Sequence, residues 1–282
     1  MAQSQEGKVF VVTGANTGIG KVTALELAKL GGKVILACRS EARAQPVVEE
    51  IIQETGNSDV RFEQLDLGDL NSVKACAERI LATENKIDVL INNAGLAGSS
   101  GLTQSGFELA FGVNHVGHFL LTELLLPRLK ESAPSRIVNV ASRAHTKSTG
   151  IDFDAVKEKT KTVTGLPEYQ ASKLANVLHA NELARRLEGT GVTTYSLHPG
   201  VVASDVWREV PGLIRWIMKL FMISNEEGAL TTLHCAISPE AGEESGLYYD
   251  KSRAIKPHPM ALDESLAKEL WDRSEEWVAD FR

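Results

Sequence analysis

Tyr169 and Lys173, in the stretch YQASK, have the residue types and the spacing for proton transfer. Residues four apart on a helix share a face, and a helical pattern runs here from Pro167 to Glu188. An ammonium beside a phenol favours the phenolate, and lowering a tyrosine pKa from about 10 to near 7 requires roughly 4 kcal/mol. Such a tyrosine can protonate a nascent alkoxide or deprotonate an alcohol. Alone, this spacing is more typical of surface neighbours, so other motifs have to support it.

The stretch TGANTGIG, Thr13 to Gly20, lies between a strand-like apolar run and a helix-like run. Glycine has no Cβ, so Gly14, Gly18 and Gly20 permit positive φ and the close approach of a phosphate. A helix N-terminus adds N–H groups and a positive dipole end, which suit pyrophosphate. The pattern predicts a phosphate-binding turn, and a tight turn without a ligand is the alternative for a glycine-rich segment taken alone.

Charged residues follow the next two predicted strands. Arg39, in ILACRS, stands where a dinucleotide-binding sheet meets the adenosine ribose. An acidic residue there would bind the 2′-hydroxyl of NAD, whereas an arginine offers a cationic fork to a 2′-phosphate. Asp66, in QLDL, is placed either to accept a hydrogen bond from an adenine amino group or to cap its own loop. NADP(H) is therefore the favoured cofactor, and NAD(H) stays an alternative.

Short β-branched runs alternate with helical patterns along the whole chain, which is typical of a parallel sheet covered on both faces. We therefore predict an α/β fold: one Rossmann-type, doubly wound, seven-stranded parallel sheet in a single domain spanning 1–282. Its ligands should bind where the carboxyl ends of the strands meet a reversal of strand order. A substrate-loop segment is expected at about 204–224 and a C-terminal extension at about 250–282. The strand-like runs are KVFVVTG, KVILACR, VRFEQLDL, KIDVLINNAG, SRIVNVAS, VTTYSLHPG and GLYYD.

Composition excludes several classes of protein. A formal net charge of −7 argues against nucleic acid as a partner, because such binders carry a basic patch or stripe. The three cysteines form no CxxC pair, so neither a disulfide framework nor a zinc knuckle is indicated, and a reducing, cytoplasmic location fits. The opening MAQSQEGK lacks the features of a signal peptide, and no uninterrupted apolar run reaches about 18 residues. We expect no transmembrane segment.

Three further patterns have competing interpretations. The segment PGLIRWIMKLFMI has apolar residues at helical spacing and could form a lid over a lipophilic substrate. Core packing and a helix at a membrane surface are its alternatives, so peripheral membrane contact stays open. His115 and His118 form an HxxH pair without further ligands, which indicates packing or surface residues rather than a metal site. His198, before Pro199, is placed for a structural role or for contact with a nicotinamide.

Taken in order, TGANTGIG, NNAG, GVNHVGHFLLT, NVAS, YQASK and HPG resemble the short-chain dehydrogenase/reductase superfamily over Lys8 to about Tyr249. The resemblance implies a catalytic tetrad. In it, Ser142 polarises the substrate carbonyl and Tyr169 transfers the proton. Lys173 holds the ribose and lowers the tyrosine pKa, and Asn114 supports a water relay.

The resemblance also implies the surroundings of the cofactor. NNAG would steady the central sheet, and Pro199, Gly200 and Val202 would border the nicotinamide. Ser204 stands where the family usually has threonine, and its hydroxyl could still contact the carboxamide. The complete predicted cofactor site comprises Gly14, Asn16, Thr17, Gly18, Ile19, Gly20, Arg39, Ser40, Asp66, Leu67, Asn93, Ala94, Gly95, Tyr169, Lys173, Pro199, Gly200, Val202 and Ser204.

A closer likeness is to the retinol dehydrogenase branch, on TGANTGIGK, ACR, VNHVGHFLLT, SKLANVL, HPGVV and LHCA. That branch reduces retinal and other apolar aldehydes or ketones, mostly with NADPH, which implies the same activity here. Its vertebrate members carry an N-terminal membrane anchor, whereas this sequence starts at the sheet. Helices near Ser105 to Lys130 and Pro167 to Glu188 resemble those that pair in family dimers and tetramers, so a homodimer or homotetramer is expected by analogy.

Other functional classes fit this pattern of motifs less well. A non-catalytic NADP(H)-binding sensor or scaffold protein is the main alternative, although such relatives usually lose a tetrad residue. Sugar-nucleotide epimerases and dehydratases share the Tyr and Lys pair, but their turn usually runs GxxGxxG, whereas this one is GxxxGxG. A serine hydrolase is excluded because NVASRA lacks the G-x-S-x-G elbow.

Overall fold

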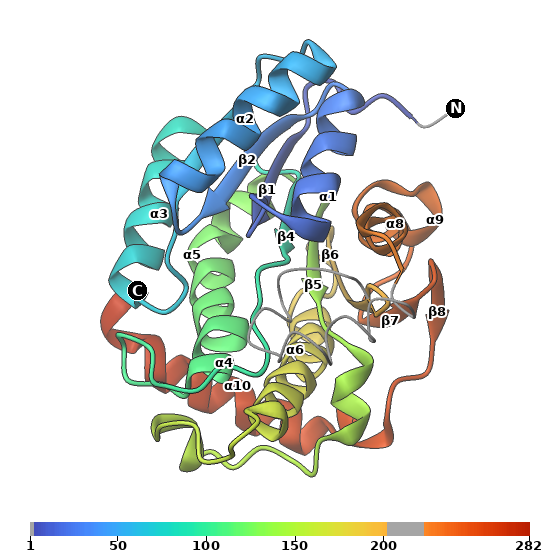
Figure 1. The fold of residues 1–282 in the computed structure, drawn as a ribbon. Helices are drawn as coiled ribbons and strands as arrows, with labels where there is room; N and C mark the ends of the chain where they lie inside the picture. The colour runs from blue at the N-terminus through green and yellow to red at the C-terminus, as the bar shows by residue number, and fades with distance from the viewer. Residues whose placement is uncertain (1–2, 202–222) are drawn as a thin grey trace.

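A computed structural model describes residues 3–201 and 223–282 (Figure 1). Strands form at the predicted apolar runs because a strand buried on both faces needs apolar side chains in succession. The strands are β1 (Val9–Thr13), β2 (Lys33–Cys38), β3 (Val60–Gln64), β4 (Val89–Asn92), β5 (Ser135–Val140), β6 (Val192–His198), β7 (Leu247–Asp250) and β8 (Arg253–Ile255).

Helices alternate with these strands through most of the described chain. They are α1 (Gly18–Lys29), α2 (Glu41–Thr55), α3 (Leu70–Thr83), α4 (Leu109–Phe111), the π-helix η1 (Gly112–Val116), α5 (Gly117–Glu131), the 3₁₀ helices η2 (Arg143–Lys147) and η3 (Ala155–Lys157), α6 (Leu166–Arg186), α8 (Asn225–Ile237), α9 (Pro239–Gly242), η5 (Pro259–Leu262), α10 (Glu264–Val278) and η6 (Ala279–Phe281).

The strands form one sheet in the order β3-β2-β1-β4-β5-β6-β7-β8. The seven predicted strands, β1 to β7, are parallel to one another. The prediction of a seven-stranded, wholly parallel sheet missed β8, which pairs antiparallel with β7 at the edge. Strand order reverses between β1 and β4, so the carboxyl ends of these two strands border the position where such sheets bind ligands.

Helices cover both faces of the sheet (Figure 1), and buried apolar side chains form one core cluster on each face. In β1, Val9 and Val11 belong to the cluster that includes α3, α5 and α6, whereas Phe10 and Val12 belong to the cluster that includes α1, α2 and α8. Side chains alternate between the two faces of a strand, so a single apolar run supplies both layers. The doubly wound prediction is confirmed.

The C-terminal helix α10 packs across α6 and α5 (Figure 1). Trp271 of α10 is buried, and its ring centroid lies 5.0 Å from that of Phe119 in α5. The guanidinium of Arg186 in α6 lies over the Trp271 ring, 4.3 Å from the centroid. One aromatic side chain therefore joins α10 to both α5 and α6.

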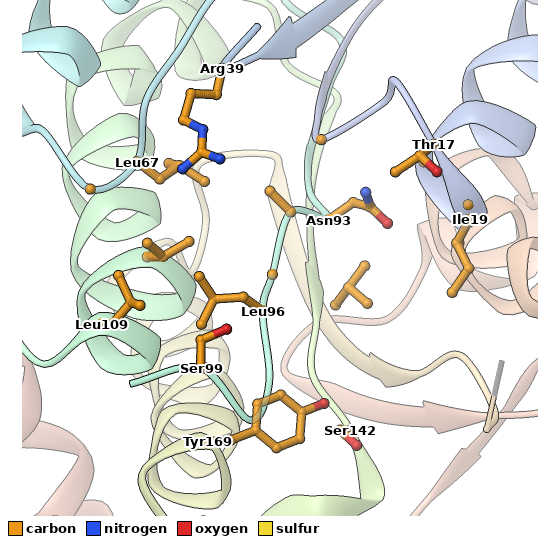
Figure 2. A pocket seen from close by; sticks show the side chains of 18 of the residues that line it. Thr17, Ile19, Arg39, Leu67, Asn93, Leu96, Ser99, Leu109, Ser142 and Tyr169 are labelled. Carbon is orange, nitrogen blue, oxygen red and sulfur yellow. The ribbon is translucent and has the colours of Figure 1, made fainter. Parts of the chain in front are cut away.

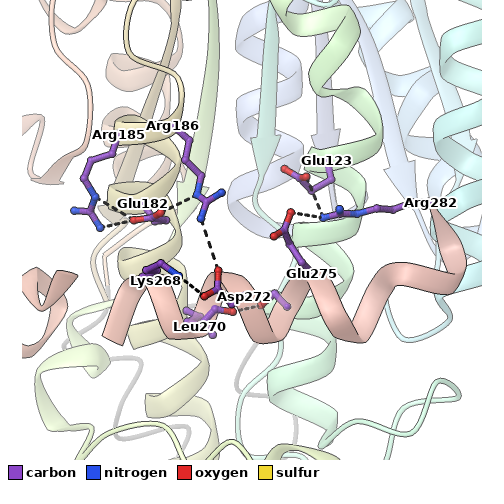
Figure 3. A network of polar contacts seen from close by, with 10 residues as sticks. Glu123, Glu182, Arg185, Arg186, Lys268, Leu270, Asp272, Glu275 and Arg282 are labelled. Atoms are coloured by element: carbon purple, nitrogen blue, oxygen red, sulfur yellow. Dashed lines mark hydrogen bonds and ion pairs between the residues drawn. The ribbon is translucent and has the colours of Figure 1, made fainter. Parts of the chain in front are cut away.

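Ion pairs also link the C-terminal segment to α5 and α6 (Figure 3). Glu182 of α6 accepts a hydrogen bond of 2.7 Å from Arg186, which also lies 3.9 Å from Asp272 of α10. Arg282, the last residue, lies 3.2 Å from Glu123 of α5. The two arginines and Asp272 are partly exposed, so water screens their attractions, and the buried Trp271 contributes more to holding α10.

Within the described residues, one helical stretch, Leu109–Glu131, has the length and apolar composition of a membrane span. Its apolar window is 72% buried inside the domain, where it packs on the sheet. That burial is typical of a core helix.

Candidate active site

A pocket of about 1270 Å³ lies at the carboxyl ends of the central strands (Figure 2). The structure brings most of the predicted site residues to its wall. The predicted residues that line it are Gly14, Asn16, Thr17, Gly18, Ile19, Gly20, Arg39, Ser40, Asp66, Leu67, Asn93, Ala94, Gly95, Ser142, Tyr169, Lys173, Pro199 and Gly200. Val202, Ser204 and residues 204–222 of the predicted substrate loop lie outside the described residues.

The glycine-rich turn packs closely against NNAG. Gly14 has φ +66°, and a Cβ there would lie 2.9 Å from Cα of Ala94. A Cβ at Gly20 would lie 2.4 Å from Nδ2 of Asn93 and 2.6 Å from the carbonyl oxygen of Gly14. These two glycines are required by the packing of the protein itself, which brings the N-terminus of α1 to the pocket. That arrangement fits a pyrophosphate.

Thr13, the last residue of β1, connects this turn to the next motif. Its Oγ1 accepts hydrogen bonds of 2.9 Å from the backbone N–H groups of Asn93 and Ala94 and lies 2.9 Å from Nε2 of His118. Nδ1 of His118 lies 3.1 Å from the carbonyl oxygen of Asn114, so Nδ1 carries the proton and donates it. Burial lowers the pKa of His118 to about 3, and the ring is therefore neutral. The histidine packs as predicted and also orients polar groups.

Asn114 lies behind the pocket wall rather than in it. Its side chain is fully buried in the π-helix η1, a helix type that often marks functional sites. Nδ2 donates to the carbonyl oxygen of Leu96 at 3.0 Å and to Oγ of Ser172 at 2.9 Å, and Oδ1 accepts from the N–H of Leu96 at 3.0 Å. Asn114 thus fixes the loop after NNAG and backs Gly95, where a Cβ would lie 3.3 Å from Oδ1.

Tyr169, Ser142 and Lys173 meet at one end of the pocket, with the Tyr169 hydroxyl beside Ser142 (Figure 2). The Ser142 side chain hydrogen-bonds to Tyr169, and Oγ of Ser142 also accepts from the N–H of Ala144 at 3.1 Å. Lys173 is buried; its Nζ lies 5.7 Å from the centre of the Tyr169 ring and donates to the carbonyl oxygen of Val140 at 2.8 Å.

The expected lowering of the Tyr169 pKa is not what the protein alone produces. Burial raises the pKa of Tyr169, and the hydrogen bond from Ser142 opposes that shift without reversing it. Burial also lowers the pKa of Lys173 to about 8. Desolvation penalises the charged form of each group, and it is the largest cause of both pKa shifts. In this structure the phenol is the stable form of Tyr169.

The opposite end of the pocket holds Arg39, whose guanidinium points into the cavity near Leu67 (Figure 2). A cationic fork there fits a 2′-phosphate. Asp66 also lines the pocket, and its Oδ1 accepts a hydrogen bond of 2.9 Å from the N–H of Gly68. The carboxylate therefore caps its own loop, the alternative that the sequence left open, while remaining at the wall where an adenine would lie.

Several wall residues were not predicted as part of the site. Leu96, Leu109 and Val113 form an apolar wall, and they pack in one cluster with Tyr169. The spacing of Leu109 and Val113, four residues apart, was a signal for a shared helical face. Arg143 lines the pocket beside Ser142 and is paired with Asp250 at 2.6 Å. That ion pair joins segments 107 residues apart, and nothing in the sequence indicates it.

His198 reaches the pocket wall beside Pro199, where the sequence placed it. Its Nδ1 accepts a hydrogen bond of 3.3 Å from the N–H of Arg143, and burial lowers its pKa to about 4. The ring is neutral and supports the segment after Ser142. Within residues 3–201 and 223–282, no three His, Cys, Asp or Glu side chains are grouped so as to hold a metal ion.

Comparison with known proteins gives consistent matches. The family model for short chain dehydrogenases matches residues 8–212. The chain is 48% identical to human retinol dehydrogenase 11 over 271 residues, which are 95% of this chain and 85% of the relative. It is 46% identical to dehydrogenase/reductase SDR family member 13 of Bos taurus over 280 residues, which are 96% of this chain and 73% of the relative.

Among solved structures, the chain resembles the 3-ketoacyl-(acyl-carrier-protein) reductase of Brucella melitensis in complex with NADH. The TM-score is 0.70 and the identity 26%, covering 88% of this chain and 97% of the reductase. The structural match and the sequence matches therefore indicate the same family.

Proposed function

Because the chain belongs to the short chain dehydrogenase family, in its retinol dehydrogenase branch, we propose that it interconverts apolar aldehydes or ketones and their alcohols with NADP(H). The observation that carries the proposal is the grouping of Tyr169, Ser142 and Lys173 at one end of a pocket that has Arg39 at the other. The first group suits proton transfer, and the second suits a 2′-phosphate.

The wall fits a nicotinamide dinucleotide, since the glycine turn, the N-terminus of α1 and NNAG form a continuous surface. The first N–H groups of α1 (Gly18–Lys29) have no partner within the helix, and they lie at the pocket, which suits a pyrophosphate. Bound there, the dinucleotide supplies or accepts the hydride.

The chain's own residues then have separate tasks. Oγ of Ser142 already accepts a hydrogen bond from Ala144, so its proton can be donated to a substrate oxygen. Tyr169 gives its phenolic proton to the same oxygen during reduction and takes it back during oxidation. The raised pKa of Tyr169 keeps that proton in place at neutral pH, which is the state that reduction requires. Asn114, through Leu96, holds the wall behind them.

The apolar wall supports a lipophilic substrate. Leu96, Leu109 and Val113 pack in one cluster with Tyr169, and Leu96 and Leu109 lie on the side of its ring away from Ser142 (Figure 2). Burying apolar substrate there would contribute about 25 cal/mol per Å². The name of the human relative, retinol dehydrogenase 11, points to the same class, and we propose retinal-like carbonyls as substrates.

We further propose that residues 1–282 form one catalytic domain and that the protein is cytoplasmic. The three cysteines are free and buried, which suits a reducing compartment. The homodimer or homotetramer stays a prediction, and any assembly built on α6 would have to accommodate α10, which packs against that helix.

The test is a steady-state screen of the purified chain with retinal, medium-chain aldehydes, steroid ketones and quinones, each with NADPH and with NADH. The proposal predicts the highest kcat/KM for an apolar carbonyl with NADPH. Tight NADPH binding without oxidation by any carbonyl would favour the sensor, and a preference for polar substrates would refute the proposed substrate class.

A further inference from the structure

His145 lies directly behind Ser142 and outside the pocket wall. It belongs to η2 and is only 1% exposed. Its ring stacks edge-on against Tyr248 of β7, with the two centroids 4.9 Å apart. The residue is therefore buried next to a predicted catalytic side chain without being able to touch a substrate.

The two ring nitrogens of His145 face opposite kinds of partner. Nδ1 lies 2.7 Å from the carbonyl oxygen of Ser142, which can only accept a hydrogen bond. Nε2 lies 3.2 Å from the backbone nitrogen of His258, which can only donate one. The neutral tautomer with its proton on Nδ1 satisfies both partners, whereas either other form of the ring places N–H against N–H or leaves the Ser142 carbonyl facing a lone pair.

His145 thus bridges Ser142 and His258, and further hydrogen bonds hold each of these two partners in the fold. At one end, the carbonyl of Ser142 also accepts from the N–H of His145 at 3.2 Å, and Oγ of Ser142 accepts from Ala144. At the other end, β8 pairs with β7 just before His258, and the carbonyl oxygen of Ala261 accepts a hydrogen bond of 2.7 Å from Asn181 of α6. The segment 253–262 is thereby held on α6, the helix that carries Tyr169.

We propose that His145 is a positioning residue: the backbone N–H of His258 selects its Nδ1–H tautomer, and that tautomer holds the backbone of Ser142 in place beside Tyr169. The proposal rests on the proposed function in one respect, the catalytic use of Ser142. It gives the C-terminal segment 253–262 a role in assembling the active site.

Two substitutions can each reproduce one of the two hydrogen bonds that the His145 ring makes. In His145→Asn, an amide N–H takes the position of Nδ1 and can bond the Ser142 carbonyl. In His145→Gln, an amide oxygen takes the position of Nε2 and can accept from His258. We expect His145→Asn to keep kcat within about twofold of the wild type. His145→Gln and His145→Ala should lose about fivefold or more, the factor for one typical net hydrogen bond. The KM for NADPH should stay unchanged in all three.

The backbone N–H of His258, which selects the His145 tautomer, can be removed separately. His258 has φ −57°, which proline also adopts, so His258→Pro deletes the N–H without forcing the local backbone. His258→Ala keeps the N–H and is the matched control. The proposal predicts a lower kcat in His258→Pro than in His258→Ala, with equal KM for NADPH.

Two measurements do not depend on activity. Long-range ¹H–¹⁵N spectra of the wild type should show a neutral His145 ring protonated on Nδ1 at pH 7. Amide exchange should show His258 N–H protected in the wild type and in His145→Gln but not in His145→Ala. A ring protonated on Nε2, or a charged ring, would overturn the proposal, as would an equal loss of kcat in His145→Asn and His145→Ala. If the wild type reduced no carbonyl, the proposed function would fail, and the spectra and exchange rates would still decide the His145 bridge.

Discussion

Nζ of Lys173 lies 2.8 Å from the carbonyl oxygen of Val140, the last residue of β5. This contact satisfies one of its three donors in a buried site, and burial lowers the Lys173 pKa from 10.5 to about 8. The unfolded chain therefore binds this proton more tightly than the folded protein does. Below about pH 8 the folded protein holds a buried charge, and the resulting loss of stability disappears as pH rises from about 8 to 10.5.

Lys173→Met, which cannot titrate, should expose this effect. Its free energy of unfolding relative to the wild type should be higher at pH 7 than at pH 10.5 by roughly 3 kcal/mol, at 1.36 kcal/mol per pKa unit. Urea unfolding at several pH values measures the difference, because every other titrating group is common to both proteins. The exposed Lys147→Met should show no such trend. A gap that stays constant with pH would contradict the burial of a titrating Lys173.

Arg39→Asp should change which cofactor the protein prefers. Loss of a charge-assisted hydrogen bond to the 2′-phosphate, at about 1.5–3 kcal/mol, should weaken NADPH binding by about 10- to 100-fold and leave NADH nearly unaffected. Fluorescence titration gives both Kd values. Arg273→Asp, at an exposed position on α10 away from the pocket, carries the same charge change and is the control. An equal effect on the two cofactors would remove the argument for a 2′-phosphate at Arg39.

Leu109→Asn should act on the substrate rather than on the cofactor. Burial of a leucine-sized surface contributes about 1.5–3 kcal/mol, so the KM for retinal should rise by about 10- to 100-fold. The KM for a two-carbon aldehyde and the Kd of NADPH should hardly change. Leu230→Asn, at a position 58% exposed on α8, is the matched control. A uniform loss on all carbonyls would indicate damage to the fold instead of a lost apolar contact.

Trp271→Ala should destabilise the protein by about 3–5 kcal/mol, because it removes the largest buried contact between α10 and the helices beneath it. Thermal unfolding at fixed pH measures the loss. Leu262→Ala, at a position 44% exposed just before α10, should cost less than about 0.5 kcal/mol. If Trp271→Ala melted like the wild type, the ring contacts of Trp271 with Phe119 and Arg186 would not hold α10 in solution.

The sequence predicted β1 to β7 because each lies in a short run rich in β-branched or aromatic residues, and in the central strands β1 and β4 every residue is buried. It did not predict β8, Arg253–Ile255, since all three residues are exposed and only backbone pairing with β7 makes them a strand. The helix expected from Ser105 begins at Leu109 and contains a π-helix at Asn114, a local geometry that apolar periodicity does not encode.

The predicted fold brings the site residues to one pocket, but it does not predict their pKa shifts or their hydrogen-bond partners. Spacing alone places Lys173 on the same helical face as Tyr169, and it does not reveal that Nζ turns to Val140 or that both groups are desolvated. The link between His145 and His258 joins residues 113 apart through a contact that only packing creates. Burial and partners far away in the sequence determine these pKa shifts and contacts, and a short sequence motif encodes neither.

The central claim is that Tyr169 transfers a proton to the carbonyl oxygen, and Tyr169→Phe tests it most directly. The substitution removes only the hydroxyl, so the Kd of NADPH should stay within about twofold. The rate of NADPH oxidation with saturating retinal should fall by about 10²- to 10⁴-fold, the usual contribution of a positioned acid. A Tyr169→Phe protein that oxidises NADPH at the wild-type rate would contradict the account.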